Sequence, residues 1–135
     1  MEYSDKLLEH FYAPRNVGFL PDASGIGEEG DPKCGDVLKM YIKVENNIIK
    51  EVRFKAFGCG SAIASASIAT ELIKNKSLED AWEITNKSVI EALDGMPSSK
   101  IHCSVLAEQT IHKAINDYRT RNGLNPWEDK LNSHD

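Results

Sequence analysis

The sequence lacks the features that mark several specialised classes of protein. No apolar run approaches the roughly 18–20 residues of a transmembrane helix, and residues 1–5 have neither the basic region nor the apolar stretch of a signal peptide. Basic residues are not in excess, because 16 Lys and Arg stand against 21 Asp and Glu, for a net charge of −5. Dedicated nucleic-acid-binding domains usually carry a basic patch. We therefore expect a cytoplasmic protein with no membrane and no nucleic-acid partner.

Cysteine is also scarce, with three residues in a chain of 135. An odd number in a reducing compartment argues against a disulfide framework and favours metal or thiol chemistry. A chain of this length buries about 68% of its unfolded surface, so it needs no disulfide to hold a core. We predict one domain over residues 1–123, followed by a polar C-terminal tail over residues 124–135.

The clearest pattern of secondary structure is a β-hairpin. Residues 37–44 alternate between apolar and other side chains with a period of two, which indicates a half-buried strand. Asn46 and Asn47 tolerate the positive φ angles of a tight hairpin turn, and residues 51–56 alternate in the same way. One face of the hairpin is polar, so we expect helices to cover only the other face.

Helical patterns flank this hairpin on both sides, which predicts an α+β fold. The stretch between residues 18 and 30 is rich in glycine and predicts a flexible loop. The predicted helices cover residues 3–11 and 60–75, two short segments that open with capping serines at Ser77 and Ser88, and a long last segment that ends near Gly123.

All three cysteines lie at joints between the predicted elements. Cys34 precedes the first strand, Cys59 stands between two glycines before a helix, and Cys103 follows His102 at the start of the last helix. Helix N-termini favour the thiolate form of cysteine. With Asp36, these residues form a candidate site for zinc, copper(I) or an iron–sulfur cluster. Spacing alone is equally consistent with three separate buried thiols, because the chain has no C-x-x-C motif.

Four segments of the sequence carry a resemblance to a known family. They are Pro14-Arg15-Asn16-Val17-Gly18, Cys34-Gly35-Asp36-Val37, the run FKAFGCGSAIAS from Phe54 to Ser65, and Lys100-Ile101-His102-Cys103-Ser104. In this order they resemble the IscU/NifU-type iron–sulfur cluster assembly scaffolds (the NifU N-terminal domain family), from Tyr3 to about Arg119. The resemblance implies a small antiparallel sheet of about three strands, with helices packed on one face. It also implies a non-enzymatic scaffold that builds clusters from ferrous iron and persulfide sulfur and transfers them to apo-proteins.

The resemblance gives each residue of the candidate site a role. Cys34, Cys59 and Cys103 match the family's three cluster-ligand cysteines. Asp36 matches the aspartate that binds iron and keeps the cluster labile, and His102 matches the neighbouring histidine. The implied cargo is Fe²⁺ and a transient [2Fe–2S] cluster, with [4Fe–4S] as the alternative and Zn²⁺ in the cluster-free form.

The resemblance also implies partner proteins. Cys103 matches the cysteine that accepts persulfide sulfur from a pyridoxal-phosphate cysteine desulfurase of the IscS/NifS type, and Lys100 matches an assisting lysine beside it. Tyr3 matches a tyrosine implicated in dimer contacts, which leaves monomer and homodimer both open. A ferredoxin is implied as the electron donor, and apo iron–sulfur proteins are implied as acceptors. Bacterial members often carry Leu-Pro-Pro-Val-Lys as the grip for an Hsp70-type chaperone, whereas this chain has Met96-Pro97-Ser98-Ser99-Lys100, which leaves that partner open.

Three other interpretations of the cysteines were weighed against the scaffold. Zinc-dependent sulfur-transfer proteins of the SufU type resemble this chain, but they carry an insertion between the second and third cysteines and lack the histidine. Here Cys59 and Cys103 are 44 residues apart, and His102 is present. A structural zinc domain normally draws four ligands from paired knuckles, which the scattered cysteines do not provide. A Cys/His hydrolase would need an acidic partner and an oxyanion site, neither of which is identifiable in the sequence.

Overall fold

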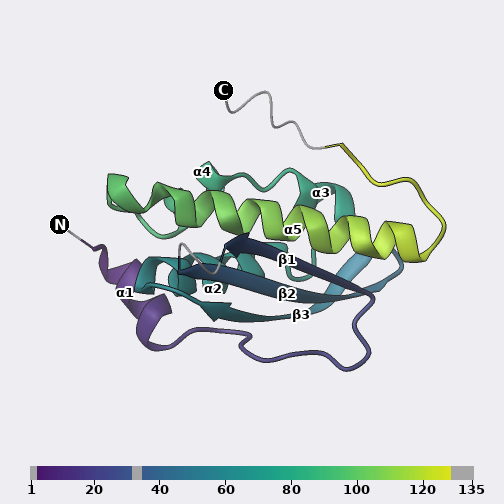
Figure 1. Ribbon diagram of the computed structural model, residues 1–135, viewed down its shortest axis with the longest axis horizontal. Helices are drawn as coiled ribbons and strands as arrows, with labels where there is room; N and C mark the ends of the chain where they lie inside the picture. Colours follow the sequence, from purple (N-terminus) through teal and green to yellow (C-terminus); the bar gives the residue numbers. More distant parts are fainter. Residues whose placement is uncertain (1–2, 32–34, 129–135) are drawn as a thin grey trace.

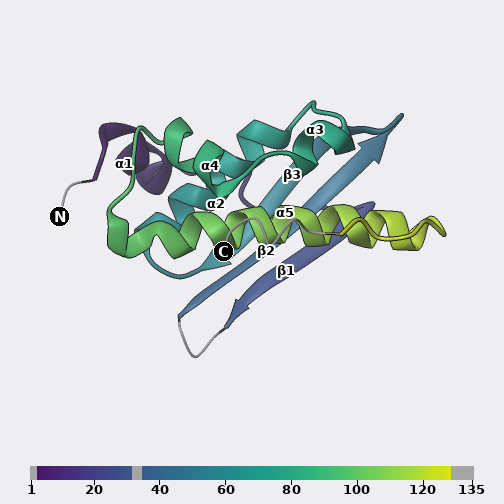
Figure 2. The ribbon, with the colours of Figure 1, turned by 90° about the horizontal axis from the view of Figure 1, so that it is seen from above.

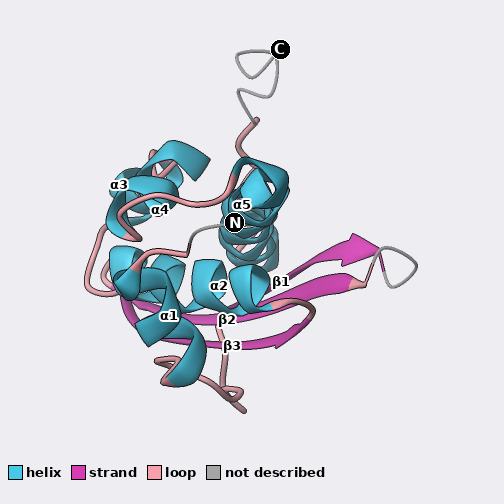
Figure 3. Ribbon diagram, turned by 90° about the vertical axis from the view of Figure 1, so that its left-hand side faces the viewer, coloured by secondary structure: helices cyan, strands magenta, loops and turns pink. Residues whose placement is uncertain are grey.

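The computed structural model describes residues 3–31 and 35–128. Its centre is a three-stranded antiparallel sheet in the order β1-β2-β3, with the long last helix and a second helix lying over one face (Figures 1 and 3). This confirms the predicted α+β architecture. The elements are α1 (Asp5–Tyr12), β1 (Gly25–Asp31), β2 (Asp36–Glu45), β3 (Ile48–Phe57), α2 (Gly60–Ile73), α3 (Leu78–Trp82), α4 (Asn86–Ala92), the 3₁₀ turn η2 (Ser98–Lys100) and α5 (Ile101–Arg121).

The predicted hairpin is confirmed in its position and its turn. Asn46 and Asn47 both have positive φ, 54° and 66°, as a tight turn between twisted strands requires. The apolar residues of β2 pair with those of β3, for example Met40 with Phe54, and both side chains are at most 2% exposed. This apolar face of the sheet forms one side of the hydrophobic core, and the helices pack on it.

The first strand corrects an expectation, because the glycine-rich stretch contains β1 rather than a flexible loop. A Cβ on Gly27 would lie 2.5 Å from the backbone of α5, at Ala114 N and Thr110 O, and a Cβ on Gly25 would also clash with that helix. Glycine is needed here because it lets α5 pack directly on the strand. In the view from above, α5 lies across the strands of the sheet (Figure 2).

The short helices confirm one predicted start and correct the other. Ser77 caps α3, because its hydroxyl accepts the Asp80 N–H at 3.1 Å. The next helix does not begin with Ser88 as its cap. Thr85 is the N-cap of α4, and Ser88 occupies the third helical position, from which its hydroxyl accepts the Thr85 N–H in a capping box. None of the helices in residues 3–31 and 35–128 is long and apolar enough to cross a membrane.

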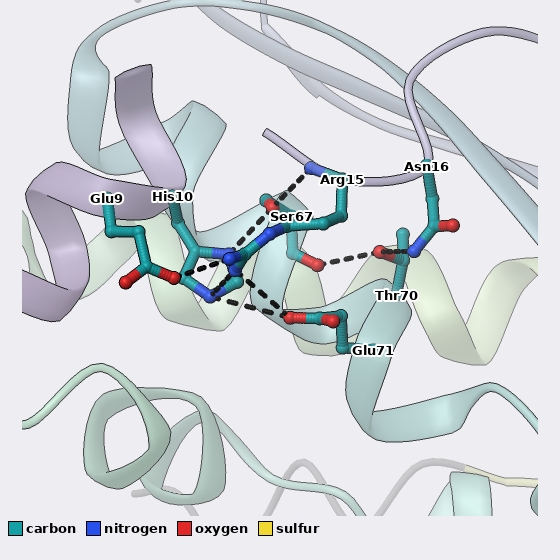
Figure 4. Close-up of polar contacts among 7 residues, drawn as sticks. All are labelled: Glu9, His10, Arg15, Asn16, Ser67, Thr70 and Glu71. Carbon is teal, nitrogen blue, oxygen red and sulfur yellow. Dashed lines mark hydrogen bonds and ion pairs between the residues drawn. The ribbon is translucent and has the colours of Figure 1, made fainter. Parts of the chain in front are cut away.

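A polar network joins α1 and the chain that follows it to α2 (Figure 4). His10 is fully buried, with its Nδ1 2.8 Å from the Ser67 hydroxyl and its Nε2 2.6 Å from the Arg15 guanidinium. Arg15 also pairs with Glu9 and, at 3.3 Å, with Glu71. Because a guanidinium can only donate and Arg15 Nη1 lies within 3.2 Å of both ring nitrogens, the neutral form of the ring is favoured over the charged form. Burial and the Arg15 charge accordingly lower the pKa of His10.

Candidate metal centre

Three separate elements bring their ligand-forming side chains to one end of the sheet. Asp36 opens β2, Cys59 is the N-cap of α2, and Cys103 lies in the first turn of α5. A carboxylate oxygen of Asp36 and the two Sγ atoms all lie within 4.8 Å of one another. Figure 1 shows the starts of β2 and α5 at this end of the molecule. The structure therefore brings together three of the residues that the sequence singled out.

The two cysteines face each other without forming a disulfide. Their Sγ atoms are 3.8 Å apart and both thiols are free, whereas a disulfide needs about 2.05 Å. The N-termini of α2 and α5 both lie at this point, and helix N-termini favour negative charge. Two thiols and a carboxylate arranged in this way can bind a thiophilic metal such as zinc or iron.

His102 lies beside this group and contacts two of its members. Its Nε2 is 3.2 Å from Asp36 Oδ2 and 3.6 Å from Cys103 Sγ. The His102 side chain is 60% exposed, whereas that of Asp36 is only 14% exposed. His102 is thus the most solvent-accessible of the donors that the structure describes at this point, and it can reach a metal held by the other three.

Cys103 differs from the easily ionised thiol that its place at a helix N-terminus suggests. The residue is only 1% exposed. Burial raises the pKa of its thiol to about 12, and the neighbouring Cys59 and Asp36 raise it as well, against a lowering effect from Lys100. Crowded anionic groups cannot all ionise without a compensating cation. A bound metal cation provides that compensation, so metal binding and thiol deprotonation are coupled at this site.

The remaining predicted residues have different outcomes. Cys34 lies outside the described residues, so its place in the site stays a prediction. Lys100 is the residue before α5, where its charge acts on Cys103. Tyr3 lines a pocket of about 750 Å³ together with Ser4 and the loop 94–99, which contains most of the segment that replaces the family's chaperone-binding motif.

A second pocket next to the site was not anticipated. It has a volume of about 510 Å³ and shares Asp36 and His102 with the metal-binding group. The additional α5 residues that line it are Val105, Leu106 and Gln109. With His102 these residues follow an i, i+3, i+4, i+7 spacing, which places them on one helix face. That spacing is the signal that could have identified them.

Comparison with known proteins identifies relatives along nearly the whole chain. Residues 2–125 match the family described as the NifU-like N terminal domain. An iron–sulfur cluster assembly scaffold protein IscU from Azotobacter vinelandii is 51% identical over 129 residues, covering 92% of this chain and 99% of the relative. IscU 1 from Archaeoglobus fulgidus is 50% identical over 121 residues, covering 90% and 79% respectively.

Solved structures show the same fold at lower sequence identity. A protein from Fervidobacterium islandicum, described as a scaffold for the SUF system, superposes with a TM-score of 0.70 at 21% identity and covers 84% of this chain and 96% of its own. A NifU-like N-terminal domain from Brucella abortus gives a TM-score of 0.54 at 14% identity, with coverages of 84% and 80%. At these identities the likeness concerns the fold alone.

Proposed function

Because the chain belongs to the NifU-like N-terminal domain family, we propose that it is a scaffold on which iron–sulfur clusters are assembled and from which they pass to other proteins. The convergence of Asp36, Cys59 and Cys103 from three elements onto one point is the observation that carries this proposal. Relatives that are named as IscU scaffolds support it. A scaffold binds and releases its cargo without catalytic turnover, so the protein is not an enzyme.

The proposed cargo is Fe²⁺ and a [2Fe–2S] cluster, with [4Fe–4S] as the alternative. Cys59, Cys103 and Asp36 supply two thiolates and one carboxylate, and His102 stands within reach of the same point. Cys34 would supply the third thiolate, as the family resemblance implies. The same donors suit Zn²⁺ in the cluster-free protein.

Asp36 is the ligand through which the cluster leaves. Four thiolates hold an iron–sulfur cluster firmly, which suits electron transfer but not delivery. A carboxylate is a harder ligand than a thiolate and binds iron–sulfur clusters less well. The bond between Asp36 and the cluster would therefore be the weakest of the protein's bonds to it. A thiolate of the recipient protein can then enter at this position.

Cys103 is the residue that receives sulfur. Its thiolate attacks the outer sulfur of the desulfurase persulfide, the S–S bond of that persulfide breaks, and the desulfurase cysteine leaves as a thiolate. Two electrons, which a ferredoxin partner would supply, then release hydrosulfide and regenerate the Cys103 thiolate. Because Cys103 is buried and its pKa is raised, docking of the desulfurase must first expose it. Lys100 assists, since its charge opposes the rise in pKa.

The partners of the scaffold follow from these steps. They are a cysteine desulfurase of the IscS/NifS type, a ferredoxin and apo iron–sulfur proteins as recipients. The pocket formed by Tyr3, Ser4 and the loop 94–99 is the place to look for an Hsp70-type chaperone or a second copy of the chain. Its Ser98 and Ser99 replace residues of the family's chaperone-binding motif.

The test follows cluster assembly by visible absorption under anaerobic conditions. The chain is incubated with ferrous iron, cysteine, a reductant and a cysteine desulfurase, and apo-ferredoxin is added at the end. We expect sulfide-to-iron charge-transfer bands that grow and then shift to those of the recipient. Cys59→Ser removes a ligand and is expected to prevent the bands. A parent protein that shows no bands would contradict the proposal.

A zinc-dependent sulfur-transfer protein of the SufU type is the second candidate, favoured by a donor set that suits zinc. The two candidates share the persulfide on Cys103, so Cys103→Ser is expected to abolish it in mass spectra while zinc still binds through the remaining ligands. They differ in the absorption experiment. Persulfide on Cys103 of the parent without any charge-transfer bands would favour the sulfur-transfer protein.

A further inference from the structure

The Asp36 carboxylate has two protein partners that do not depend on a metal. Its Oδ1 accepts the backbone N–H of Cys59 at 3.3 Å, and its Oδ2 lies 3.2 Å from His102 Nε2. Cys59 is the N-cap of α2, yet its own side chain makes no capping hydrogen bond. The carboxylate binds the N–H of the N-cap residue itself and thus lies at the N-terminus of α2, where the helix dipole favours a negative charge.

The position of this carboxylate depends on the absence of a side chain at Gly58. A Cβ built on Gly58 would lie closer than 3.0 Å to Asp36 Oδ1, a separation that real Cβ atoms essentially never show, and 3.2 Å from Asp36 Cγ. The space that a side chain would need at residue 58 is the space that the carboxylate occupies. The nearest obstacle is the end of the Asp36 side chain rather than backbone, so the carboxylate would move. The positive φ of Gly58, 159°, and the Ala62 Cβ, which would lie 3.2 Å away, add a strain that does not depend on Asp36.

We propose that Gly58 is a positioning residue that gives the Asp36 carboxylate a resting place away from the metal, on the Cys59 N–H and His102. The inference rests on the proposed scaffold function and names a residue that controls release. A buried carboxylate that leaves a metal without finding new donors is costly. With the resting place available, the carboxylate can leave the cluster at low cost, and the cluster is easily released.

The direction of the effect of Gly58→Ala follows from this geometry. The new methyl group blocks the approach of Asp36 to the Cys59 N–H. If the carboxylate stays bound to the metal, it has no hydrogen-bond donors to move to when the recipient protein binds. If the methyl group keeps the carboxylate away from the metal, the easily exchanged ligand is lost. Both outcomes slow transfer. We expect a roughly tenfold slower transfer to apo-ferredoxin, the size that corresponds to losing one hydrogen bond to a charged group.

A double-mutant cycle separates this effect from general strain at residue 58. The cycle compares the transfer rates of Gly58→Ala, Asp36→Ala and the double variant. Asp36→Ala is itself expected to give a longer-lived cluster and slower transfer. In the double variant the methyl group no longer meets a carboxylate, so adding Gly58→Ala should cause no further slowing. Equal slowing with and without Asp36 would overturn the proposal, as would a Gly58→Ala protein that transfers at the parental rate.

A second measurement uses the metal-free protein and does not depend on cluster assembly. The amide signal of Cys59 in ¹H–¹⁵N NMR spectra reports its hydrogen bond to Asp36. We expect Gly58→Ala to shift this signal in the same direction as Asp36→Ala does, while the far-UV circular dichroism is unchanged. Gly60→Ala is the control for adding a methyl group on the other side of Cys59, because the atoms nearest to its Cβ belong to the movable ring of Phe11, at 3.1–3.4 Å, and not to Asp36. A Cys59 amide that responds to Asp36→Ala but not to Gly58→Ala would contradict the proposal.

The two measurements also distinguish the failure of the scaffold function from the failure of this inference. A parent protein that never shows charge-transfer bands defeats the scaffold function, while the amide measurement still decides whether Gly58 positions Asp36. If Gly58→Ala is unstable, the unfolding free energies decide. The positive φ of Gly58 strains an alanine there with or without Asp36, whereas the clash with the carboxylate requires Asp36. The proposal therefore requires Gly58→Ala to lower the stability less in the Asp36→Ala background than in the parent, and an equal loss in both backgrounds would refute the assignment.

Discussion

At the residue scale, Cys59 and Cys103 differ in burial although their sulfur atoms are 3.8 Å apart. Cys103 is buried, and burial together with the neighbouring Cys59 and Asp36 raises the pKa of its thiol to about 12, whereas Cys59 is half-buried at the cap of α2. The thiolate is the reactive form and must also be accessible. Neighbouring cysteines at one site can therefore serve different steps of assembly.

This difference predicts the order of alkylation in the metal-free protein. The background variant is Cys34→Ser, which leaves two thiols. In it we expect iodoacetamide at pH 7.5 to modify Cys59 at least about tenfold faster than Cys103. Peptide mass spectrometry gives the two rates. In concentrated guanidinium chloride the rates should become similar, because the burial that protects Cys103 is lost. Faster labelling of Cys103 in the folded protein would show that its thiol is exposed in solution.

The sequence identified the chemistry of the site but not its accessibility. The resemblance to the IscU/NifU-type family, rather than spacing alone, predicted that Asp36, Cys59, His102 and Cys103 share one site with Cys34, and the structure brings the first four side chains together. The burial of Cys103 depends on how the first turn of α5 packs against other elements, which no local pattern encodes. Gly58 was quoted within a motif, but its effect on Asp36 is a contact between β2 and the loop before α2 and appears only in three dimensions.

At the element scale, β1 shows why a glycine-rich segment need not be a loop. The sequence contains no apolar alternation there, so periodicity predicted no strand. Gly25 and Gly27 are nevertheless required, because α5 lies where their side chains would be. Further hydrogen bonds tie the strand to that helix, including one from the Ile26 N–H to the Asp117 carboxylate at 2.8 Å. A segment can be rich in glycine because another element packs closely on its backbone or because it is a flexible loop. The sequence alone does not distinguish these two cases.

Gly27→Ala is therefore expected to destabilise the protein. A Cβ at this position would lie 2.5 Å from backbone atoms of α5, so the helix must move, and overpacking of this kind costs about 1–3 kcal/mol of unfolding free energy. Urea unfolding monitored by circular dichroism measures the loss. Glu28→Ala is the matched control on the exposed neighbour and should change the stability by less than about 0.5 kcal/mol. Equal stability of Gly27→Ala and the control would show that β1 is loosely attached to α5.

The junction between α1 and α2 predicts a dependence of stability on pH. Burial and the Arg15 charge lower the pKa of His10 below its ordinary value of 6.5. The unfolded chain then takes up this proton more readily than the folded chain. The stabilisation that neutral His10 contributes to the unfolding free energy is fully present above pH 6.5, and it is lost as the pH falls below that value.

Urea titrations at pH 7 and pH 5 measure this loss. We expect the urea concentration at the unfolding midpoint of the parent protein to be lower at pH 5 than at pH 7. In His10→Gln, which cannot titrate, the fall between pH 7 and pH 5 should be smaller, whatever its stability at pH 7. An unchanged fall in His10→Gln would mean that other groups carry the acid sensitivity.

At the scale of the whole molecule, the candidate metal centre and the C-terminal segment lie near opposite ends of α5. Cys103 is in the first turn of that helix, whereas Asn116 and Arg119 near its end hold Trp127. The sequence predicted a polar tail from residue 124, and this boundary stays a prediction. Trp127 was noted only as an apolar exception within that tail. Its packing against the helices could not be predicted, because the chain must turn back onto α5 to reach Asn116 and Arg119, and its aromatic partner Trp82 is 45 residues away.

Trp127 ties α3 to α5. Its backbone exchanges two hydrogen bonds with the Asn116 side chain, at 2.7 and 2.9 Å. Its ring packs edge-on against Trp82 of α3, with centroids 5.3 Å apart, and lies 4.4 Å from the Arg119 guanidinium. Since α3 has only five residues, it cannot be stable by itself and depends on contacts of this kind.

Trp127→Ala should therefore weaken the helical layer without altering the distant metal site. Losing the aromatic pair and the cation–π contact costs about 1–3 kcal/mol of unfolding free energy, which lowers the melting temperature by roughly 4–10 °C. Zinc affinity, measured by competition with a chromophoric chelator, should stay at the parental value. Leu124→Ala changes a more exposed residue of the same segment and should leave the melting temperature within about 2 °C. If Trp127→Ala lowered zinc affinity as well, the two ends of α5 would be coupled, and the release of cargo would depend on the C-terminal segment.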